Sequence, residues 1–456
     1  MNNKQIERLW RLAYKLRGAF EISELYKIML YGILLKHIEY EKEDICSYDE
    51  KYSLGYLSLT YGKIVKPNDV LDYLRKIELE LGLDAGVISE SFDQVFGRAD
   101  SENVRILFEN LNELDIESSE SCYQLALVIV NKMMISAGRM GCEFGTNIAL
   151  TKLEKALLDV QDGMSVYDAY CGTGISVNEV SSGKGKVFMQ DMSISSIGIA
   201  AIISVLSGNR IGKVRCADSL HNPIELKGQY DRVVCEPPFS LKYDKGYMES
   251  IPEGNCIYRE CLESESLALR HSIASLKDGG IAVVLVPMGM LFKSGRMGEV
   301  RKSLVDDSYI DAIIELPNGI LPGSSVATAL VVLKKNRTES EIMMINAKEF
   351  CTKDKNTVTV TDENVKRIVQ IYRNREVIEG VSNTISKETT AENGYNLCTT
   401  QYVTRKAREG IVVEDNAKFI ENYNVLLQRL GDIDKELDKV RSRFVKEAWL
   451  WVILHS

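Results

Sequence analysis

Residues 165–174 read SVYDAYCGTG, in which a short apolar run is followed by an acid and two closely spaced glycines. The run has the length of a buried strand, and a helical pattern follows the second glycine. Gly172 and Gly174 permit a tight turn and a close approach of the backbone to a ligand. The N–H groups of such a turn can hold polar ligand groups. Taken alone, this segment fits either a cofactor loop or a plain turn between strand and helix.

Short apolar runs of the same kind recur through the middle of the chain. They alternate with helical patterns, such as Ile194 to Leu206 and Glu263 to Leu276. This alternation predicts βαβ units, and therefore an α/β fold with a doubly wound, mostly parallel, Rossmann-like sheet. In such sheets ligands bind at the carboxyl ends of the strands. The predicted strands are Ser165 to Tyr167, Lys186 to Met189, Arg232 to Cys235, Ile281 to Val286, Tyr309 to Glu315 and Ala327 to Leu333.

Two further acids follow predicted strands. Asp191 lies about 20 residues after the glycine turn, a spacing that suits the hydroxyl pair of a ribose. Asp218 follows the apparent strand Val214 to Ala217 and can accept a hydrogen bond from an adenine amino group. Either acid alone is better explained as a helix cap, because a serine follows each of them closely. Together with Asp168 they place three acids at the ends of successive strands, which favours a nucleoside site.

The motif Glu236-Pro237-Pro238-Phe239 comes directly after the predicted strand Arg232 to Cys235. The two prolines fix the backbone and remove its donors, so that bare carbonyls face outward. Such carbonyls, with a side-chain oxygen beside them, can accept both hydrogens of an exocyclic amine. The neighbouring aromatic ring can stack on an extruded base. The alternative, a rigid loop after a strand, is less favoured because the upstream motifs also indicate a nucleoside ligand.

The regions that flank the predicted sheet differ from it. The first part of the chain, about 120 residues, is helix-rich, since Leu9, Ala13, Leu16 and Phe20 recur at helical spacing. Within it, the polar segment from Tyr40 to Val70 is predicted to be a loop. Near the other end a heptad pattern predicts a coiled-coil segment, or alternatively an amphipathic helix that packs on the chain itself. Its apolar positions are Phe419, Tyr423, Leu426, Leu430, Ile433, Leu437, Val440 and Phe444.

The composition bears on metals, membranes and nucleic acid. The ten cysteines form no CxxC pair and only four histidines accompany them, so no metal site is expected. The longest apolar run, Ile281 to Phe292, is too short to cross a bilayer, and the N-terminus lacks an apolar signal-peptide core. We therefore expect a cytoplasmic protein without membrane contact. The net charge of −9 leaves two accounts open: nucleic acid is not the substrate, or DNA binding depends on a local basic strip and a partner.

The order of these segments resembles that of the DNA amino-methyltransferases, whose target-site motif is Asn/Asp/Ser-Pro-Pro-Tyr/Phe. Over nearly the whole chain it resembles the modification (M) subunit of type I restriction-modification systems. Glu143-Phe144-Gly145-Thr146 is similar to the Phe-x-Thr-Pro segment of that subunit. Lys277-Asp278-Gly279-Gly280 and Leu316-Pro317 match later parts of its sheet. Each piece alone is unspecific, and the common order of the pieces makes the match specific.

The resemblance implies transfer of a methyl group from S-adenosylmethionine to N6 of adenine in double-stranded DNA. The target adenine would be flipped out and stacked on Phe239. The carbonyl of Pro237 and the side chain of Glu236 would accept hydrogen bonds from its amino group. The catalytic residues implied are therefore Glu236, Pro237, Pro238 and Phe239. The cofactor-binding residues implied are Phe144, Thr146, Asp168, Cys171, Gly172, Thr173, Gly174, Asp191, Asp218 and Ser219.

The resemblance also implies a domain organisation and partners. It implies an N-terminal helical domain at residues 1–125, a methyltransferase domain at 126–350 and a C-terminal region at 351–456. The heptad helix of the last region would dock on a specificity (S) subunit, with two M subunits for each S subunit. A restriction (R) subunit is a further partner of such complexes.

The chain departs from the family at three positions in these motifs. Residue 236 is Glu rather than Asn or Asp, Ala169 replaces a proline, and Asn147 replaces the proline after Thr146. The extra methylene of Glu236 moves the acceptor by roughly 1.5 Å, and placement errors near 1 Å can cost about 100-fold in rate. Two alternatives stay open. One is a catalytically impaired M-like scaffold or DNA-binding subunit, and the other is a methyltransferase for protein glutamine or RNA.

Overall fold

The computed structural model describes residues 3–16, 18–41, 46–114, 116, 118–136, 148–252, 257–258, 261–321, 324–354, 357–404, 428–429 and 432–433. The chain forms two compact units, Met1–Thr404 and Arg405–Ser456. Most of the predicted heptad lies outside the described residues. The two pairs of residues that are described there, at 428–429 and 432–433, are helical.

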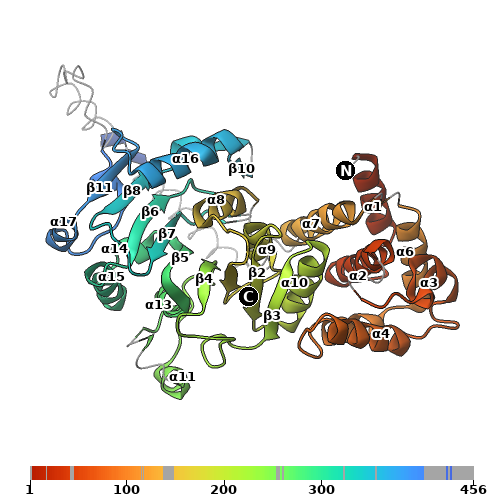
Figure 1. Cartoon of the computed structure of the whole chain (residues 1–456). Coiled ribbons are helices and arrows are strands. Elements are labelled where there is room, and N and C mark those ends of the chain that lie inside the picture. Colours follow the sequence, from red (N-terminus) through yellow and green to blue (C-terminus); the bar gives the residue numbers. More distant parts are fainter. Residues whose placement is uncertain are drawn as a thin grey trace, which may run out of the picture. The chain divides into compact units, whose positions relative to one another are not determined.

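The first unit contains a nine-stranded sheet (Figure 1). Its strands are β1 (Ser165–Asp168), β2 (Lys186–Asp191), β3 (Arg210–Cys216), β4 (Tyr230–Cys235), β5 (Leu276–Pro287), β6 (Ile310–Glu315), β7 (Thr328–Lys334), β8 (Ile342–Asn346) and β11 (Ser382–Ile385). Across the sheet the order is β11-β8-β6-β7-β5-β4-β1-β2-β3. Only β7 and β11 pair antiparallel with their neighbours in this sheet. The predicted mostly parallel α/β fold is therefore confirmed.

The order of the strands locates the expected ligand edge. The chain runs outward from β1 through β2 to β3, then returns to β4 on the other side of β1. Open α/β sheets bind ligands outside the carboxyl ends of the strands at such a reversal. All six predicted strands are present with small shifts of their ends, and the predicted helix Ile194 to Leu206 is α10 with the same bounds. The pattern missed β8 and β11, and β11 adds residues beyond position 350 to the same sheet.

Helices cover both faces of the sheet, because its strands are apolar on both sides. Along β5, Val283 and Leu285 belong to one buried cluster while Val284 and Val286 belong to the other, as the two-residue period of a strand requires. Helices α8 and α16 contribute to the first cluster and α13 and α15 to the second. The two pairs of helices lie on opposite sides of the sheet (Figure 1). The helices of this part are α8 (Ile148–Leu158), α9 (Ile175–Ser181), α10 (Ile194–Leu206), α11 (Lys245–Ser250), α13 (Ser264–Ser275), α14 (Gly289–Phe292), α15 (Arg296–Asp306), α16 (Asp362–Asn374), α17 (Lys387–Glu392) and α18 (Thr399–Tyr402).

The N-terminal part is helical, as predicted. Its helices are α1 (Asn3–Lys15), α2 (Ile22–Glu41), α3 (Leu54–Thr60), α4 (Pro67–Glu80), α5 (Ser89–Arg98), α6 (Ser101–Asn112) and α7 (Ser119–Ser136). None of the helices in the described residues is long and apolar enough to cross a membrane. A separate short two-stranded sheet pairs β9 (Thr352–Asp354) with β10 (Thr357–Thr359).

The loop predicted from Tyr40 to Val70 is wrong in its middle, where α3 forms. The Ser53 hydroxyl accepts a hydrogen bond from the N–H of Tyr56 at 3.2 Å and so caps the start of α3. Leu54 and Leu57 lie three residues apart and are completely buried. The average polarity of the segment concealed this short apolar face. The segment also includes the start of α4, where a proline occupies the first turn.

The helical part and the sheet share one continuous core, and α10 lies at their junction. Helix α10 packs against α2, α5 and α7 as well as against β2 and β3. Gly198 of α10 makes the contact with α5 possible. A Cβ at this position would lie 2.4 Å from the Cβ of Ser91 and 2.9 Å from the carbonyl oxygen of Val87. The junction therefore depends on the absence of a side chain at residue 198.

Gly198→Val is expected to destabilise the first unit by about 1–3 kcal/mol, because the new side chain must displace backbone of the facing segment. Denaturant unfolding of the full chain, followed by circular dichroism, measures this effect. Gly97→Ala is the matched control, since a Cβ there meets nothing within 4 Å. It should leave stability unchanged or raise it, as helix propensity predicts. Equal stability of Gly198→Val and the native chain would show that this junction is not close-packed.

Candidate active site

The carboxyl ends of the central strands bring most of the predicted site residues together. Asp168 ends β1, Asp191 ends β2, and Glu236 follows the last residue of β4. Asp218 lies two residues beyond β3. Because β1 pairs with both β2 and β4, residues from three motifs lie at the edge where the strand order reverses. Phe144 and Thr146 lie outside the described residues, so their predicted role stays a prediction.

The glycine turn has the backbone conformation that its sequence predicts. Gly172 and Gly174 have φ angles of 51° and 75°, in the left-handed region that favours glycine. A Cβ on Gly174 would also lie 2.9 Å from the Cβ of Ala200 in α10. The turn therefore packs closely against the helix that follows β2. Cys171 in the same turn is buried, and its N–H donates to the carbonyl of Gln190 at 3.0 Å.

Asp191 connects the glycine turn to α10. Its Oδ2 accepts a hydrogen bond from the N–H of Gly172 at 3.0 Å, and its Oδ1 accepts one from the N–H of Ser193 at 2.8 Å. Burial raises the pKa of Asp191, and these N–H groups oppose that rise. The interpretation of this residue as a cap and its interpretation as a ligand-binding acid are thus compatible. A carboxylate has about four acceptor positions, so Asp191 can accept from a ribose as well as from the N–H groups of the chain.

Asp168 lies deeper than Asp191. It is 2% exposed, and its Oδ1 accepts a hydrogen bond from the N–H of Tyr170 at 3.0 Å. Burial raises the pKa of Asp168 well above its ordinary value, and the charges of Glu236 and Asp191 raise it further. Nearby, the buried hydroxyl of Thr173 has no hydrogen-bond partner among the described residues. This part of the site therefore holds polar groups that a bound ligand could satisfy.

Asp218 is held by side chains that the sequence did not indicate. Its Oδ2 accepts hydrogen bonds from the hydroxyl of Tyr247 at 2.6 Å and from Nδ1 of His221 at 2.8 Å. Its Oδ1 accepts one from the N–H of Leu220 at 2.9 Å. Burial opposes ionisation, but these hydrogen bonds together hold the pKa of Asp218 below its ordinary value. Asp218 is therefore an ionised acceptor, and Ser219 beside it is buried.

The target-base motif forms a rigid turn after β4. Pro237 is buried, Pro238 is exposed, and Phe239 is partly buried against the core. The hydroxyl of Ser176 in α9 donates a hydrogen bond to Oε1 of Glu236. Sequence reasoning missed Ser176, which lies just after the glycine turn. The turn thus carries a partly exposed ring and an acid whose position is fixed by the neighbouring helix.

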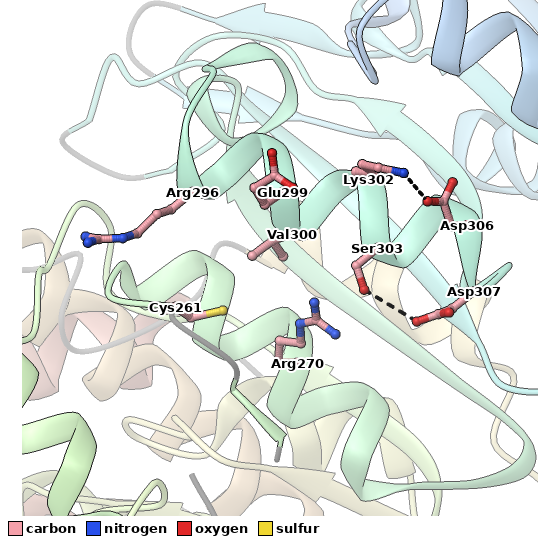
Figure 2. A pocket seen from close by; sticks show the side chains of 9 residues that line it. All are labelled: Cys261, Arg270, Arg296, Glu299, Val300, Lys302, Ser303, Asp306 and Asp307. Atoms are coloured by element: carbon pink, nitrogen blue, oxygen red, sulfur yellow. Dashed lines mark hydrogen bonds and ion pairs between the residues drawn. The ribbon is translucent and has the colours of Figure 1, made fainter. Parts of the chain in front are cut away.

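A pocket of about 560 Å³ lies apart from these motifs, against α15 (Figure 2). No residue predicted to bind cofactor or base lines it. It presents basic and acidic side chains in equal number, and Lys302 pairs with Asp306 inside α15. The pocket therefore offers no net charge to an ionic ligand. Its lining residues are Cys261, Arg270, Arg296, Glu299, Val300, Lys302, Ser303, Asp306 and Asp307.

Comparison with known proteins identifies the family. The N-6 DNA methylase family model matches residues 128–410, which is more than half of the chain. This chain belongs to the N-6 DNA methylase family. The matched range contains the glycine turn, the three acids and the Glu-Pro-Pro-Phe motif, so the family explains why these segments occur in this order.

Relatives within the family are methylase subunits of type I restriction enzymes. The MjaVII methylase subunit of Methanocaldococcus jannaschii is 27% identical over 371 residues, which cover 76% of this chain and 63% of that protein. The MpnII methylase subunit of Mycoplasma pneumoniae is 21% identical over 490 residues, which cover 88% of this chain and 90% of that protein. The chain thus spans less than two thirds of the first of these relatives and most of the second.

A solved structure supports the fold. The type I restriction-modification methyltransferase subunit of Streptococcus thermophilus superposes with a TM-score of 0.70 at 22% identity. The match covers 87% of this chain and 98% of that chain. At this identity the likeness concerns the fold, and it confirms the predicted methyltransferase architecture of the N-6 DNA methylase family.

Proposed function

We propose that this chain is the modification subunit of a type I restriction-modification system, and that it methylates N6 of adenine in DNA with S-adenosylmethionine. One observation carries the proposal. In a member of the N-6 DNA methylase family, Asp168, Asp191 and the Glu-Pro-Pro-Phe motif meet at the reversal of the strand order. This arrangement supports a nucleoside-binding edge with an acceptor for an exocyclic amine beside it.

The residues of this edge fit S-adenosylmethionine. No lysine or arginine of the described residues forms an ion pair with Asp168, although this carboxyl is buried. A ligand that carries a sulfonium and an ammonium group would compensate such a site. The unpartnered hydroxyl of Thr173 and the N–H groups of the glycine turn would hold its methionine part. Asp191 would bind the ribose, and Asp218 with Ser219 the adenine.

The Glu-Pro-Pro-Phe turn would hold the target base. Phe239 would stack on the extruded adenine, and the carbonyl of Pro237 and the carboxylate of Glu236 would accept hydrogen bonds from its amino group. These hydrogen bonds raise the availability of the N6 lone pair. Bound S-adenosylmethionine supplies an electrophilic methyl group, and the chain supplies position and electrostatic stabilisation.

The proposed function includes partners that supply sequence recognition. The relatives are named as subunits of type I restriction enzymes, and a structural neighbour comes from work on the assembly of such a system. We infer a complex with an S subunit, with two M subunits for each S subunit, and with an R subunit when DNA is cut. The C-terminal heptad would dock on the S subunit. Methylation of DNA by such a complex would take place in the cytoplasm.

The test of this function is a methylation assay with the full chain, its S subunit, labelled S-adenosylmethionine and double-stranded DNA. The expected product is N6-methyladenine in DNA. If the cofactor binds normally but no base is methylated, the chain is a scaffold. Label that appears only in RNA or on protein glutamine would instead identify the other alternative.

Asp191→Ala is expected to weaken binding of S-adenosylmethionine about 10- to 100-fold. The variant loses the ribose acceptor and releases the N–H of Gly172, and a hydrogen bond to a charged group contributes about 1.5–3 kcal/mol. Isothermal titration of the full chain measures the affinity. The control is Asp362→Ala, which removes an exposed carboxylate that pairs with Lys152 at the surface. Unchanged affinity in Asp191→Ala would refute the assignment of this residue.

A further inference from the structure

Helix α11 lies on the segment that continues from the target-base motif. It has six residues, too few for a helix to be stable by itself. None of them is fully buried, and Tyr247 and Met248 pack only partly against the core. The carboxylate of Asp244 caps the start of the helix by accepting from the N–H of Tyr247 at 2.9 Å. A cap stabilises the helix but does not attach it to the sheet, so side-chain contacts contribute to that attachment.

The polar contacts of α11 converge on Asp218, which follows β3. Oδ2 of Asp218 accepts hydrogen bonds from the hydroxyl of Tyr247 at 2.6 Å and from Nδ1 of His221 at 2.8 Å. Nε2 of His221 lies 2.8 Å from Oγ of Ser250, the last residue of the helix. The rings of Tyr247 and His221 also meet edge to face, with centroids 4.6 Å apart. Asp218 is thus connected to α11 directly and through His221.

The two oxygens of Asp218 are held differently. Oδ2 accepts from two side chains, whereas Oδ1 accepts from the N–H of Leu220 at 2.9 Å. Each oxygen of a carboxylate can accept about two hydrogen bonds, so Oδ1 can also accept one from a ligand. The side chain of Asp218 is 20% exposed, and its hydrogen bonds hold its pKa below the ordinary value. Asp218 is therefore a fixed, charged acceptor that suits an amino group.

We propose that Tyr247 is a positioning residue for Asp218: its hydroxyl fixes one oxygen of the carboxylate, so that the other accepts from the amino group of the cofactor's adenine. The inference rests on the proposed function, in which Asp218 binds this adenine. A carboxylate without such a partner can rotate, and a hydrogen bond weakens steeply when its angle is poor. Because Tyr247 belongs to the segment that continues from Phe239, the same contact links the cofactor half of the site to the target-base half.

The test compares two ligands by isothermal titration of the full chain. One is S-adenosylhomocysteine, and the other is its deamino form, in which hydrogen replaces the amino group of the adenine. The native chain should bind the first about 10- to 100-fold more tightly, because the second leaves a charged acceptor unpaired. In Tyr247→Phe this preference should fall about fivefold or more, while the affinity for the deamino form stays within about twofold of the native value.

Tyr243→Phe is the matched control. Tyr243 stacks on Tyr247 with ring centroids 4.7 Å apart, but its hydroxyl makes no hydrogen bond with the residues that the structure describes. The control therefore removes the same chemical group from the same pair of rings, and it should keep the native preference within about twofold. Phenylalanine retains the ring contacts at both positions, so the circular dichroism of both variants should match that of the native chain.

The two affinities distinguish positioning of Asp218 from simple attachment of α11. If both ligands lose affinity equally in Tyr247→Phe, the hydroxyl only attaches the helix and the proposal is overturned. It is also overturned if this variant keeps the native preference. A native chain that shows the preference but methylates no DNA would refute the proposed function and leave this role of Tyr247 standing. A native chain that binds neither ligand would refute both.

Discussion

Glu236→Ala is expected to slow methyl transfer by about 100-fold or more while S-adenosylmethionine still binds. The variant removes the side-chain acceptor for the target amino group, and a preorganised hydrogen-bonding group of this kind typically contributes about 10²- to 10³-fold. The cofactor should remain bound, because its proposed ligands belong to other strands than Glu236. Asp191 ends β2 and the glycine turn follows β1. Single-turnover methylation gives the rate, and isothermal titration gives the affinity.

Glu236→Asn separates an active enzyme from a scaffold. It installs the family's own residue and shortens the side chain by one methylene. If Ser176 already holds Glu236 in a working position, the shorter side chain should bring no gain beyond a few-fold. A rate that rises from nothing to that of an active enzyme would mean that the native chain is impaired. Equal rates in Glu236→Ala and the native chain would remove this residue from the mechanism.

The ligand edge of the sheet could be predicted because its signals are local. The apolar run, Asp168 and the two glycines all lie within residues 165–174. Asp191 and Glu236 each follow a short apolar run. In a parallel sheet the ends of successive strands meet at one edge, so these short patterns predict that the candidate site lies at that edge.

Side chains that reach the site from other elements leave no local signal. Tyr247 contacts Asp218 from 29 residues further along the chain. Glu154 of α8 is one acid in an otherwise ordinary amphipathic helix, and its burial depends on strands that follow it in sequence. The wrong prediction of a loop from Tyr40 to Val70 has a different cause, which is a local signal too short to recognise. Helix α3 does have a local signal in the sequence, but this signal consists only of one capping residue and two buried leucines.

The cost of Glu154 should appear in the stability of the chain. This side chain is completely buried, and its carboxyl oxygens have no hydrogen-bond partner among the described residues. Burial raises its pKa well above the ordinary value. A buried acid whose pKa is raised in the folded state contributes its full stability to the fold only below its unfolded pKa, which is about 4.3 for a glutamate. That stability is lost as the pH rises toward the folded pKa, because ionisation is easier in the unfolded chain. Glu154 should therefore destabilise the native chain near pH 8.

Glu154→Leu is thus expected to raise the free energy of unfolding at about pH 8 by about 1–3 kcal/mol, which is the cost of burying a polar group without a hydrogen bond, and by progressively less as the pH falls toward about 4.5. Denaturant unfolding of both chains across this range measures the difference. Asp362→Asn is the control: Lys152 lowers the pKa of this exposed acid, so its loss should not stabilise the chain. A stability gain that is independent of pH would mean that only packing changed. A variant that is more stable at pH 8 yet slower in methyl transfer would show that this buried acid is kept for activity, at the expense of stability.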